Sequence, residues 1–253
     1  MRGRELPGIL GAARAAFRAM SEVREGPVVT LDGPAGSGKS TTAREVAGRL
    51  GFRHLDSGAF YRALTFGLLE AGIGADRWQA LTAADLDGVG VRVDPTADGF
   101  RILLGERALR DELRSPLVTA YVSRLAGLGP VRQWLLGTQR AAGRRGRLVA
   151  DGRDMGTVVF PDAEVKVFLT ADLRERARRR LMEQGTPAPS PADVDREAER
   201  IASRDKDDSE RALSPLRRPE GALELDTTRL TFEQQVEAIL RCVHGLGDGA
   251  GRG

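Results

Sequence analysis

The sequence contains a single cysteine and no long hydrophobic run, and each of these absences excludes a class of protein. Cys242 cannot form an internal disulfide, which fits a reducing cytoplasm. No apolar stretch approaches the roughly eighteen residues that a membrane-spanning helix needs. With 41% hydrophobic and 30% charged residues, the 253-residue chain has the composition of a globular protein. We therefore expect a cytoplasmic protein with no membrane partner.

A strong excess of one charge is also missing. The formal net charge is +3, and the first 24 residues account for it, because they contain five arginines and two glutamates. The rest of the chain is close to neutral, which argues against a nucleic-acid partner. Lysine is scarce, because only three of the 39 basic residues are lysines. Arginine, which makes up the remainder, is the better residue for gripping phosphate bidentately.

The sequence does have a complete phosphate-binding loop pattern, G-x-x-x-x-G-K-[ST], over residues 33–40. The pattern stands between an apolar run, 28–31, and a helix-compatible stretch, 41–50, which is the context such a loop requires. Backbone N–H groups and the helix dipole there face an anion that glycine lets the main chain approach. A Gly-rich surface turn is the alternative. We predict a nucleoside triphosphate site formed by Gly33, Pro34, Ala35, Gly36, Ser37, Gly38, Lys39, Ser40 and Thr41.

Short apolar runs alternate with helix-compatible segments along most of the chain. This alternation predicts an α/β protein of the P-loop NTPase fold, a five-stranded parallel sheet with helices on both faces. The expected strands are 28–31, 53–56, 148–150, 165–169 and 222–225. Ligands of open α/β sheets gather at the carboxyl ends of such strands, where this sequence places polar residues.

Two stretches interrupt the alternation. Alternating apolar residues from Val89 to Val93 and from Phe100 to Leu104 predict a small β-hairpin. Residues 172–212 are dense in charge and contain a Pro-rich turn between two helical segments, a pattern typical of a mobile lid. We expect a flexible N-terminal extension at 1–26, unless translation starts at Met20, and a disordered Gly-rich tail at 246–253.

Three further clusters carry candidate chemistry. Arg62 lies one turn into a helix, where it could clamp an acceptor anion or be an ordinary solvated arginine. Asp151 directly follows a strand, where many loop NTPases place a carboxylate of the magnesium shell; an Asp–Arg turn network is the alternative. Arg204, Asp208 and Arg211 are spaced i, i+4, i+7, so they share one helical face, as they also would on a self-neutralising surface helix.

The reaction is narrowed by what different kinases require. A switch GTPase would carry a guanine-reading N-K-x-D segment after a strand, and the sequence has none. A kinase acting on a hydroxyl needs a carboxylate to accept the proton. A kinase acting on a phosphate monoester does not, because that oxygen is largely ionised at neutral pH (second pKa about 6). It needs cations that bring two anions together, and an arginine-rich lid meets that demand.

Together these segments resemble the bacterial cytidylate kinase family, P-loop kinases of nucleoside monophosphates. The matching blocks are 32–39, 55–62, 151–163 and 204–216, and they occur in the family's order. The first block is shared by many kinases, whereas the third is far more particular to this family. The resemblance covers about residues 27–245.

The resemblance implies transfer of the ATP γ-phosphate to CMP or dCMP, with Mg²⁺, by a monomer. It assigns residues 57–140 to an inserted nucleoside monophosphate (NMP)-binding domain with the small hairpin, and 172–200 to a helical lid. ATP and CMP or dCMP would be its partners.

The resemblance also implies roles for individual residues. Those matching Ser123, Arg132 and Asp154 bind cytosine, those matching Arg62, Arg153 and Arg211 bind the acceptor phosphate, and those matching Arg204 and Asp208 bind the sugar. Arg176, Arg179 and Arg180 are similar to lid arginines that meet ATP. We expect Lys39, Arg153, Arg176 and Arg180 to be catalytic, Ser57 and Tyr61 to belong to the substrate site, and Ser40 and Asp151 to be metal ligands.

Two other interpretations stay open from the sequence. Another small-molecule kinase, acting on UMP, a deoxynucleotide or shikimate, would share the loop and the lid. A regulatory or nucleic-acid-binding protein that uses ATP as a switch would bind a polynucleotide and hydrolyse ATP slowly without an acceptor. The near-neutral chain beyond residue 24 argues against the second.

Overall fold

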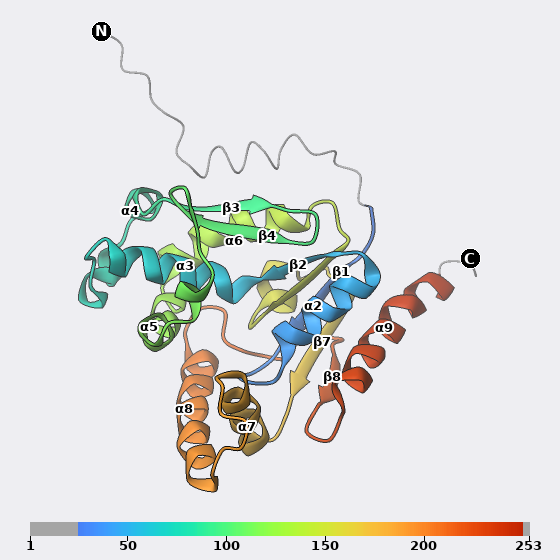
Figure 1. Cartoon of the computed structure of the whole chain (residues 1–253). Helices are drawn as coiled ribbons and strands as arrows, with labels where there is room; N and C mark the ends of the chain where they lie inside the picture. The colour runs from blue at the N-terminus through green and yellow to red at the C-terminus, as the bar shows by residue number, and fades with distance from the viewer. Residues whose placement is uncertain (1–24, 250–253) are drawn as a thin grey trace. The chain divides into compact units, whose positions relative to one another are not determined.

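The computed structural model describes residues 25–249, and the chain separates into two compact units (Figure 1). One unit comprises Pro27–Asp56 and Arg147–Gly253, and we call it the sheet unit. The other comprises Met1–Gly26 and Ser57–Gly146, and we call it the insertion unit. In chain order, most of the insertion unit therefore falls between two strands of the sheet unit.

The sheet unit is built on five parallel strands. They are β1 (Val28–Asp32), β2 (Arg53–Asp56), β6 (Leu148–Gly152), β7 (Val165–Thr170) and β8 (Leu223–Asp226), in the order β2-β6-β1-β7-β8. Asp32 of β1 lies opposite Gly152 and Phe168, so β1 and β6 end level with each other and β7 extends two residues further, to Thr170. The expected five-stranded parallel sheet is confirmed, with every strand within two residues of its predicted bounds.

Two helices, α2 (Lys39–Leu50) and α9 (Phe232–Gly249), pack against the sheet and against each other (Figure 1). Both present apolar residues at helical spacing, and these meet the alternate residues of the strands. The resulting core contains Val29, Leu31, Ala43, Val46, Ala47, Val149, Val165, Val167, Leu169, Val236, Ile239, Leu240 and Val243, all buried. This core fixes the start of α2 relative to the end of β1.

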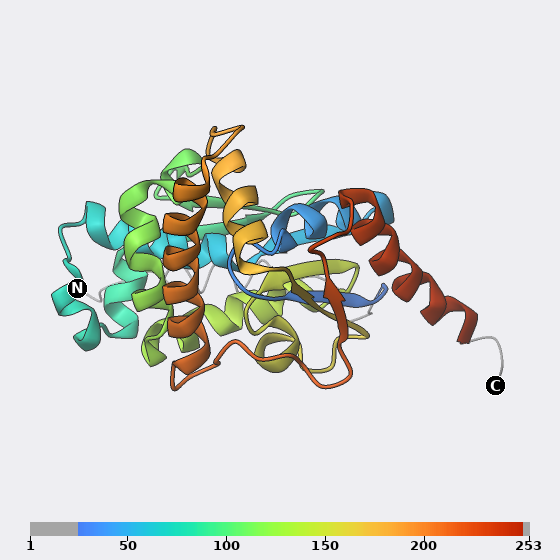
Figure 2. The ribbon, with the colours of Figure 1, turned by 90° about the horizontal axis from the view of Figure 1, so that it is seen from below.

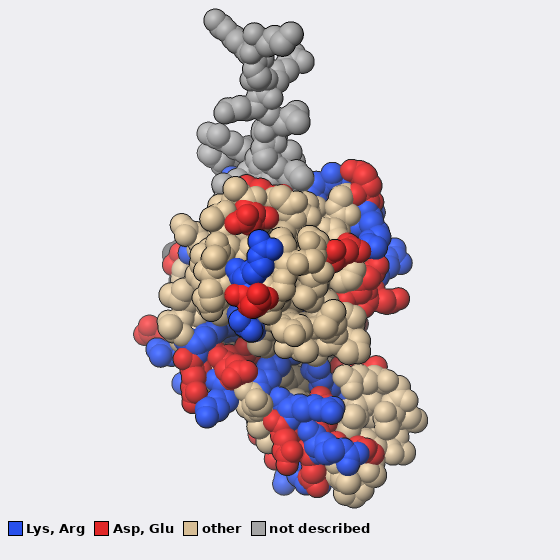
Figure 3. All heavy atoms as spheres, turned by 90° about the vertical axis from the view of Figure 1, so that its left-hand side faces the viewer, with Lys and Arg blue, Asp and Glu red and all other residues tan. Residues whose placement is uncertain are grey.

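A second pair of helices, α7 (Leu173–Glu183) and α8 (Pro191–Glu210), lies side by side in Figure 2. Asp172 caps the first helix, and Ser190 forms a capping box with Asp193 at the start of the second. Their outer surfaces carry interleaved charges, seen at the bottom of Figure 3. Exposed pairs such as Arg174 with Asp195 account for this pattern. The helices expected on either side of the Pro-rich turn are thus present.

The expectation that Arg211 continues the face of this second helix is wrong. α8 ends at Glu210, and Arg211 has an extended backbone with φ −61° and ψ 140°. Leu216 donates its backbone N–H to the carbonyl of Asp208, so the chain turns back on the helix end. Arg211 still reaches Asp208, but from this turn rather than from a further helical turn.

The insertion unit is mainly helical with one small antiparallel sheet. Its elements are α3 (Ser57–Glu70), a 3₁₀ turn (Ala75–Ala80), α4 (Ala83–Gly88), β3 (Val91–Pro95), β4 (Phe100–Leu104), β5 (Arg107–Ala108), a 3₁₀ turn (Asp111–Arg114), α5 (Pro116–Ala126) and α6 (Gly129–Gly143). The predicted hairpin corresponds to β3 and β4, but β5 extends it to three strands. Val89, which we placed in the hairpin, instead follows the last turn of α4.

The two ends of the chain differ from expectation in one respect. α9 continues to Gly249, so the helix includes residues 246–249, which we expected to be disordered. The remainder of that tail and residues 1–24 of the N-terminal extension lie outside the described residues. Between residues 25 and 249, none of the helices has the length and apolar character needed to cross a bilayer.

Replacing Gly67 by alanine is expected to destabilise the protein. Gly67 lies in α3, where a Cβ would come within 2.4 Å of a methyl group of Val89 and 3.1 Å of Leu104. Overpacking of this kind costs about 1–3 kcal/mol of unfolding free energy. Gly88→Ala is the matched control, because Gly88 is exposed at the end of a helix of the same unit with nothing within 4 Å. Denaturant unfolding that gives both variants the same stability would contradict this packing.

Candidate active site

The phosphate-binding loop connects β1 to α2 through backbone conformations that only glycine adopts easily. Gly36 and Gly38 have φ values of 73° and 83°, in the left-handed region. A Cβ on Gly33 would lie 2.2 Å from the backbone oxygen of Leu169, because the loop passes close to the end of β7. The loop leads directly into the N-terminus of the 12-residue helix α2, where backbone N–H groups and the helix dipole favour binding of an anion.

Lys39, the first residue of α2, is held inside this loop. Its Nζ donates to the carbonyl oxygen of Pro34 at 2.9 Å, and only 7% of the residue is exposed. Burial, and after it the nearby charge of Arg153, lower the pKa of Lys39 to about 7. A positively charged group in this position would be stabilised by an anion bound at the loop.

Ser40 and Asp151 are brought together, as predicted. The Ser40 hydroxyl donates to Oδ2 of Asp151 at 2.5 Å, and Nε2 of His54 contacts Oδ1 of the same carboxylate at 2.7 Å. Burial would raise the pKa of Asp151, but the hydrogen bonds from His54 and Ser40 and the charge of Lys39 outweigh it and hold the pKa below its usual value. The carboxylate is thus ionised and fixed through both oxygens.

This pair suits a hard cation. Hydroxyl and carboxylate oxygens are the ligands that Mg²⁺ prefers, usually with several waters and phosphate oxygens completing the shell. The part of the chain that the structure describes contains no group of three or more His, Cys, Asp or Glu side chains that could hold a metal by themselves. The residues present therefore fit a magnesium ion that arrives with a nucleotide better than a metal held by protein ligands alone.

Asp32, at the end of β1, anchors the segment that follows β6. Its two carboxylate oxygens accept the backbone N–H groups of Met155 and Gly156, each at 2.8 Å. Burial raises the pKa of Asp32 to about 7, although these hydrogen bonds oppose the shift. The segment that carries Arg153 and Asp154 is consequently fixed to the strand that carries the phosphate-binding loop.

Three predicted arginines converge on one carboxylate. Nε of Arg153 donates to Oδ2 of Asp208 at 2.8 Å, and Nη1 of Arg211 lies 3.8 Å from Oδ1. Burial would raise the pKa of Asp208, but the charges of Arg153, Arg204 and Arg211 lower it. The Asp208 side chain is only 6% exposed, so this cluster of charges lies in a sheltered position. Its arginines are suited to an anionic ligand.

The predicted lid arginines all have partners within the sheet unit. Arg176 donates to the carbonyls of Ala171 and Ala35 and pairs with Asp205, whose other oxygen accepts the Ala35 N–H at 2.8 Å. Arg176 and Asp205 therefore hold a residue of the phosphate-binding loop from both of its backbone groups. The first turn of α7 and the C-terminal part of α8 are in this way tied to the loop.

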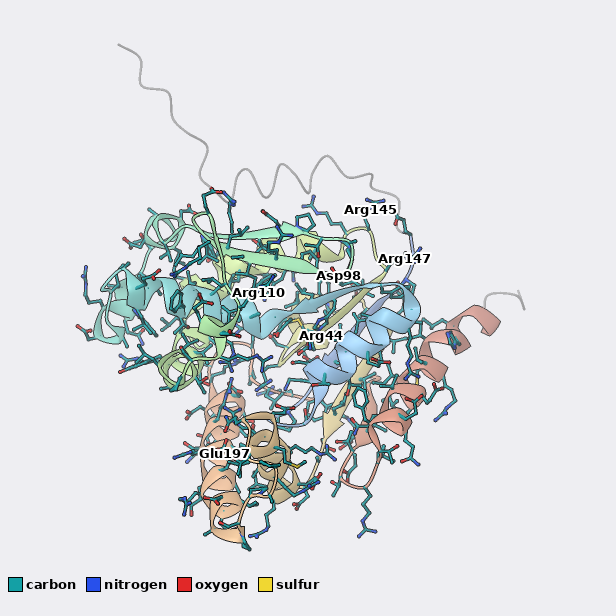
Figure 4. All side chains as sticks on the ribbon, viewed as in Figure 1. Arg44, Asp98, Arg110, Arg145, Arg147 and Glu197 are labelled. Atoms are coloured by element: carbon teal, nitrogen blue, oxygen red, sulfur yellow. The ribbon has the colours of Figure 1, made fainter. Side chains whose placement is uncertain are left out.

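The other two lid arginines are held by acidic or hydroxyl groups. Arg179 donates to Glu175 and to the hydroxyl of Thr227, at 2.7 and 2.9 Å. Arg180 lies 2.7 Å from Glu197 of α8, a residue labelled in Figure 4, whose side chain is 6% exposed. The guanidinium groups of both arginines thus have carboxylate or hydroxyl partners within the protein itself.

The predicted substrate residues of the insertion unit occupy α3, α5 and α6. Nη1 of Arg62 donates to the carbonyl of Leu113 and to the hydroxyl of Thr119, at 3.2 and 3.1 Å. Ser57 accepts from Gln139 at 2.9 Å, and Arg132 donates to the carbonyl of Ala126 with its guanidinium 5.6 Å from the ring centroid of Tyr61. Ser123 is half-buried on α5.

Sequence reasoning missed three residues that organise the site: Asp32, His54 and Asp205. Asp32 carried a usable signal, because it ends a buried strand directly before the loop, and Asp151 has a similar place one residue before the end of β6. His54 and Asp205 carried none, because their roles depend on strand register and on a contact 170 residues apart in sequence.

Residues 29–245 match the family model described as cytidylate kinase. A cytidylate kinase from Pseudomonas aeruginosa is 46% identical over 219 residues, with 85% of this chain and 94% of that protein covered. A cytidylate kinase from Exiguobacterium sp. is 44% identical over 215 residues, covering 85% and 95%. A bifunctional pantoate ligase/cytidylate kinase from Synechococcus elongatus is 44% identical over 231 residues, and the chain, with 88% covered, spans only 43% of its length.

ADP binding to the ligand-free protein is expected to take up protons at pH 8. With a pKa of about 7, Lys39 is roughly 90% neutral at that pH, and a bound phosphate stabilises its charged form. The terminal phosphate of ADP is already ionised there, with a second pKa of about 6, so the nucleotide releases few protons. Calorimetry in two buffers of different ionisation enthalpy measures the uptake. An equal uptake by Lys39→Met would contradict the assignment to Lys39.

Asp205→Ala is expected to destabilise the protein by about 2 kcal/mol, because it leaves a largely buried Arg176 and the Ala35 N–H without their acceptor. Asp205→Asn should lose less, since its amide oxygen can still accept the Ala35 N–H. Unfolding free energies from urea titration, together with ADP affinity, distinguish the two variants. If alanine and asparagine had the same effect, the hydrogen bond to the loop would not matter.

Proposed function

Because the chain belongs to the cytidylate kinase family, we propose that it transfers the γ-phosphate of ATP to CMP or dCMP, giving ADP and CDP or dCDP. One observation carries the proposal: Lys39 of the phosphate-binding loop lies within electrostatic reach of Arg153 and Arg204 as well as of Asp151 and Asp208. A donor-phosphate group and a cluster of cations suited to a second anion therefore share one place at the sheet edge. That is what transfer between two phosphates requires.

On the donor side, the loop amides and Lys39 would hold the phosphates of ATP. Ser40 and Asp151 would hold Mg²⁺, which would supply positive charge to neutralise the phosphates. Of the lid residues, Arg176 and Arg180 would be catalytic, and Arg179 would contribute to ATP binding. Residues 172–200 would form this lid.

On the acceptor side, no general base is needed, because the attacking phosphate oxygen is already ionised at neutral pH. Arg153 and Arg211 would bind that phosphate together with Arg62, while Arg204 and Asp208 would bind the sugar. Asp208 orients the Arg153 side chain in the ligand-free protein. Less conformational entropy is therefore lost when Arg153 binds a phosphate. Two anions brought together in this way react through positioning and charge stabilisation.

Base selection is proposed to rest on Ser123, Arg132 and Asp154, with residues 57–140 as the NMP-binding domain. A carboxylate and an arginine suit cytosine, which offers an amine, a ring nitrogen and a carbonyl oxygen. UMP replaces the amine by a carbonyl, so a buried carboxylate left unpaired would disfavour it by about 1–3 kcal/mol. We further propose that the enzyme is a cytoplasmic monomer.

The decisive experiment is ADP release from Mg·ATP with CMP, dCMP, UMP, AMP and shikimate as acceptors. We expect rapid release with CMP or dCMP and at least about fivefold less efficient use of UMP, in line with an unpaired carboxylate. Equal use of UMP would support a nucleotide kinase but contradict the proposed base contacts. ADP release that does not depend on any acceptor would contradict the proposed kinase activity.

Lys39→Ala is the control for this assay. Loss of one clamp group on the transferring phosphate should lower turnover at least about a hundredfold. The circular dichroism spectrum and cooperative unfolding should be retained. A folded variant with near-normal turnover would exclude the proposed role of Lys39.

A further inference from the structure

We propose that His54 is a positioning residue for the magnesium site: its ring N–H fixes the plane of the Asp151 carboxylate that, with Ser40, would receive Mg²⁺. The inference rests on the proposed function for the identity of the metal-bound ligand. It adds a residue that does not itself touch the substrate or the metal. His54 would act only through Asp151.

The sheet register brings the two side chains together. His54 of β2 lies opposite Val149 of β6, and Asp151 lies two residues further along β6. Side chains two residues apart in a strand point to the same face, so His54 and Asp151 share a face at the carboxyl end of the sheet. Nε2 of His54 then reaches Oδ1 of Asp151 at 2.7 Å.

The contact is sheltered, and both carboxylate oxygens are used. The Asp151 side chain is 2% exposed and the His54 side chain 11% exposed. Oδ2 of Asp151 is occupied by the Ser40 hydroxyl. Since Asp151 is ionised and can only accept, Nε2 of His54 must be the donor.

The second hydrogen bond supplies an orientation that the first cannot. The terminal torsion of an aspartate is broad, so a carboxylate held at one oxygen can still rotate about that bond. A donor at each oxygen defines the plane, and the remaining lone pairs then point in fixed directions. Partners that orient a metal-binding side chain commonly change metal affinity by about 10–100-fold when they are removed.

The test compares His54→Leu with His54→Gln. Leucine removes the donor, whereas the glutamine side-chain amide can reach as far as Nε2 and still donate. His244→Leu is the matched control, because His244 is the second of the two histidines and is exposed on α9. ADP affinity is measured by calorimetry without Mg²⁺ and across a Mg²⁺ titration. Turnover with CMP is measured against Mg²⁺ concentration.

We expect His54→Leu to raise the Mg²⁺ concentration for half-maximal ADP binding about tenfold or more, with ADP affinity in the absence of Mg²⁺ changed less than about twofold. Turnover should shift in the same way and recover at high Mg²⁺. His54→Gln and His244→Leu should stay close to the parent protein. A folded His54→Leu with an unchanged Mg²⁺ dependence would overturn the inference.

If His54→Leu does not fold, His54→Asn takes its place. The amide nitrogen of asparagine stops short of the position of Nε2. His54→Asn should therefore raise the Mg²⁺ concentration for half-maximal ADP binding, whereas His54→Gln should not. Equal behaviour of the two amides would overturn the inference. Failure of the proposed function can be told apart from failure of this inference. If the His54 variants change Mg·ADP binding as expected but the parent protein does not phosphorylate CMP, the inference holds and the proposed kinase activity is wrong.

Discussion

Burial of carboxylates at the carboxyl edge of the sheet is the constraint on which the site depends. An ionised carboxylate away from water is costly unless donors surround it. Three of the buried acids are satisfied by parts of the site: Asp32 by the backbone of Met155 and Gly156, Asp151 by Ser40 and His54, and Asp208 by Arg153. The contacts that satisfy these acids therefore also hold parts of the site together.

The same arrangement leaves the ligand-free site electrostatically incomplete. Lys39 is buried near other cations, which lowers its pKa to about 7, and Arg204 and Arg211 add positive charge around a single Asp208. Such a site is less stable empty than an apolar core of the same volume would be. Phosphate groups supply the missing negative charge, so the instability of the free protein becomes affinity for its ligands. Preorganised charge of this kind needs little rearrangement when the reacting groups arrive.

The parts of the fold set by local patterns were predictable, and those set by long-range contacts were not. Five strands and the loop followed from short apolar runs that end at polar residues, and all five were found. The two-residue strand β5 was too short to give a pattern, and the end of α8 before Arg211 depends on the chain turning back onto Asp208. In the candidate site, Ser40 was predicted from the phosphate-binding loop pattern and Asp151 from its place directly after an apolar run. His54 and Asp205 act across register and across distant elements, which one sequence does not reveal.

The predicted lid arginines and Arg153 are paired with carboxylates, and under the proposed function they would exchange these partners for the phosphates of a nucleotide. Arg180 faces Glu197, Arg176 faces Asp205, and Arg153 faces Asp208. Each partner is a carboxylate, which offers a guanidinium the same bidentate geometry as a phosphate. Exchanging one anion for another would keep the arginine paired, but the buried carboxylate that it leaves would need another donor. Glu197 has one, because Nη1 of Arg200 donates to it at 3.3 Å. Where the carboxylate also holds another element, as Asp205 holds the loop, exchange would loosen that element. Under the proposed function, Arg180 would therefore exchange partners more readily than Arg176, which also braces the loop.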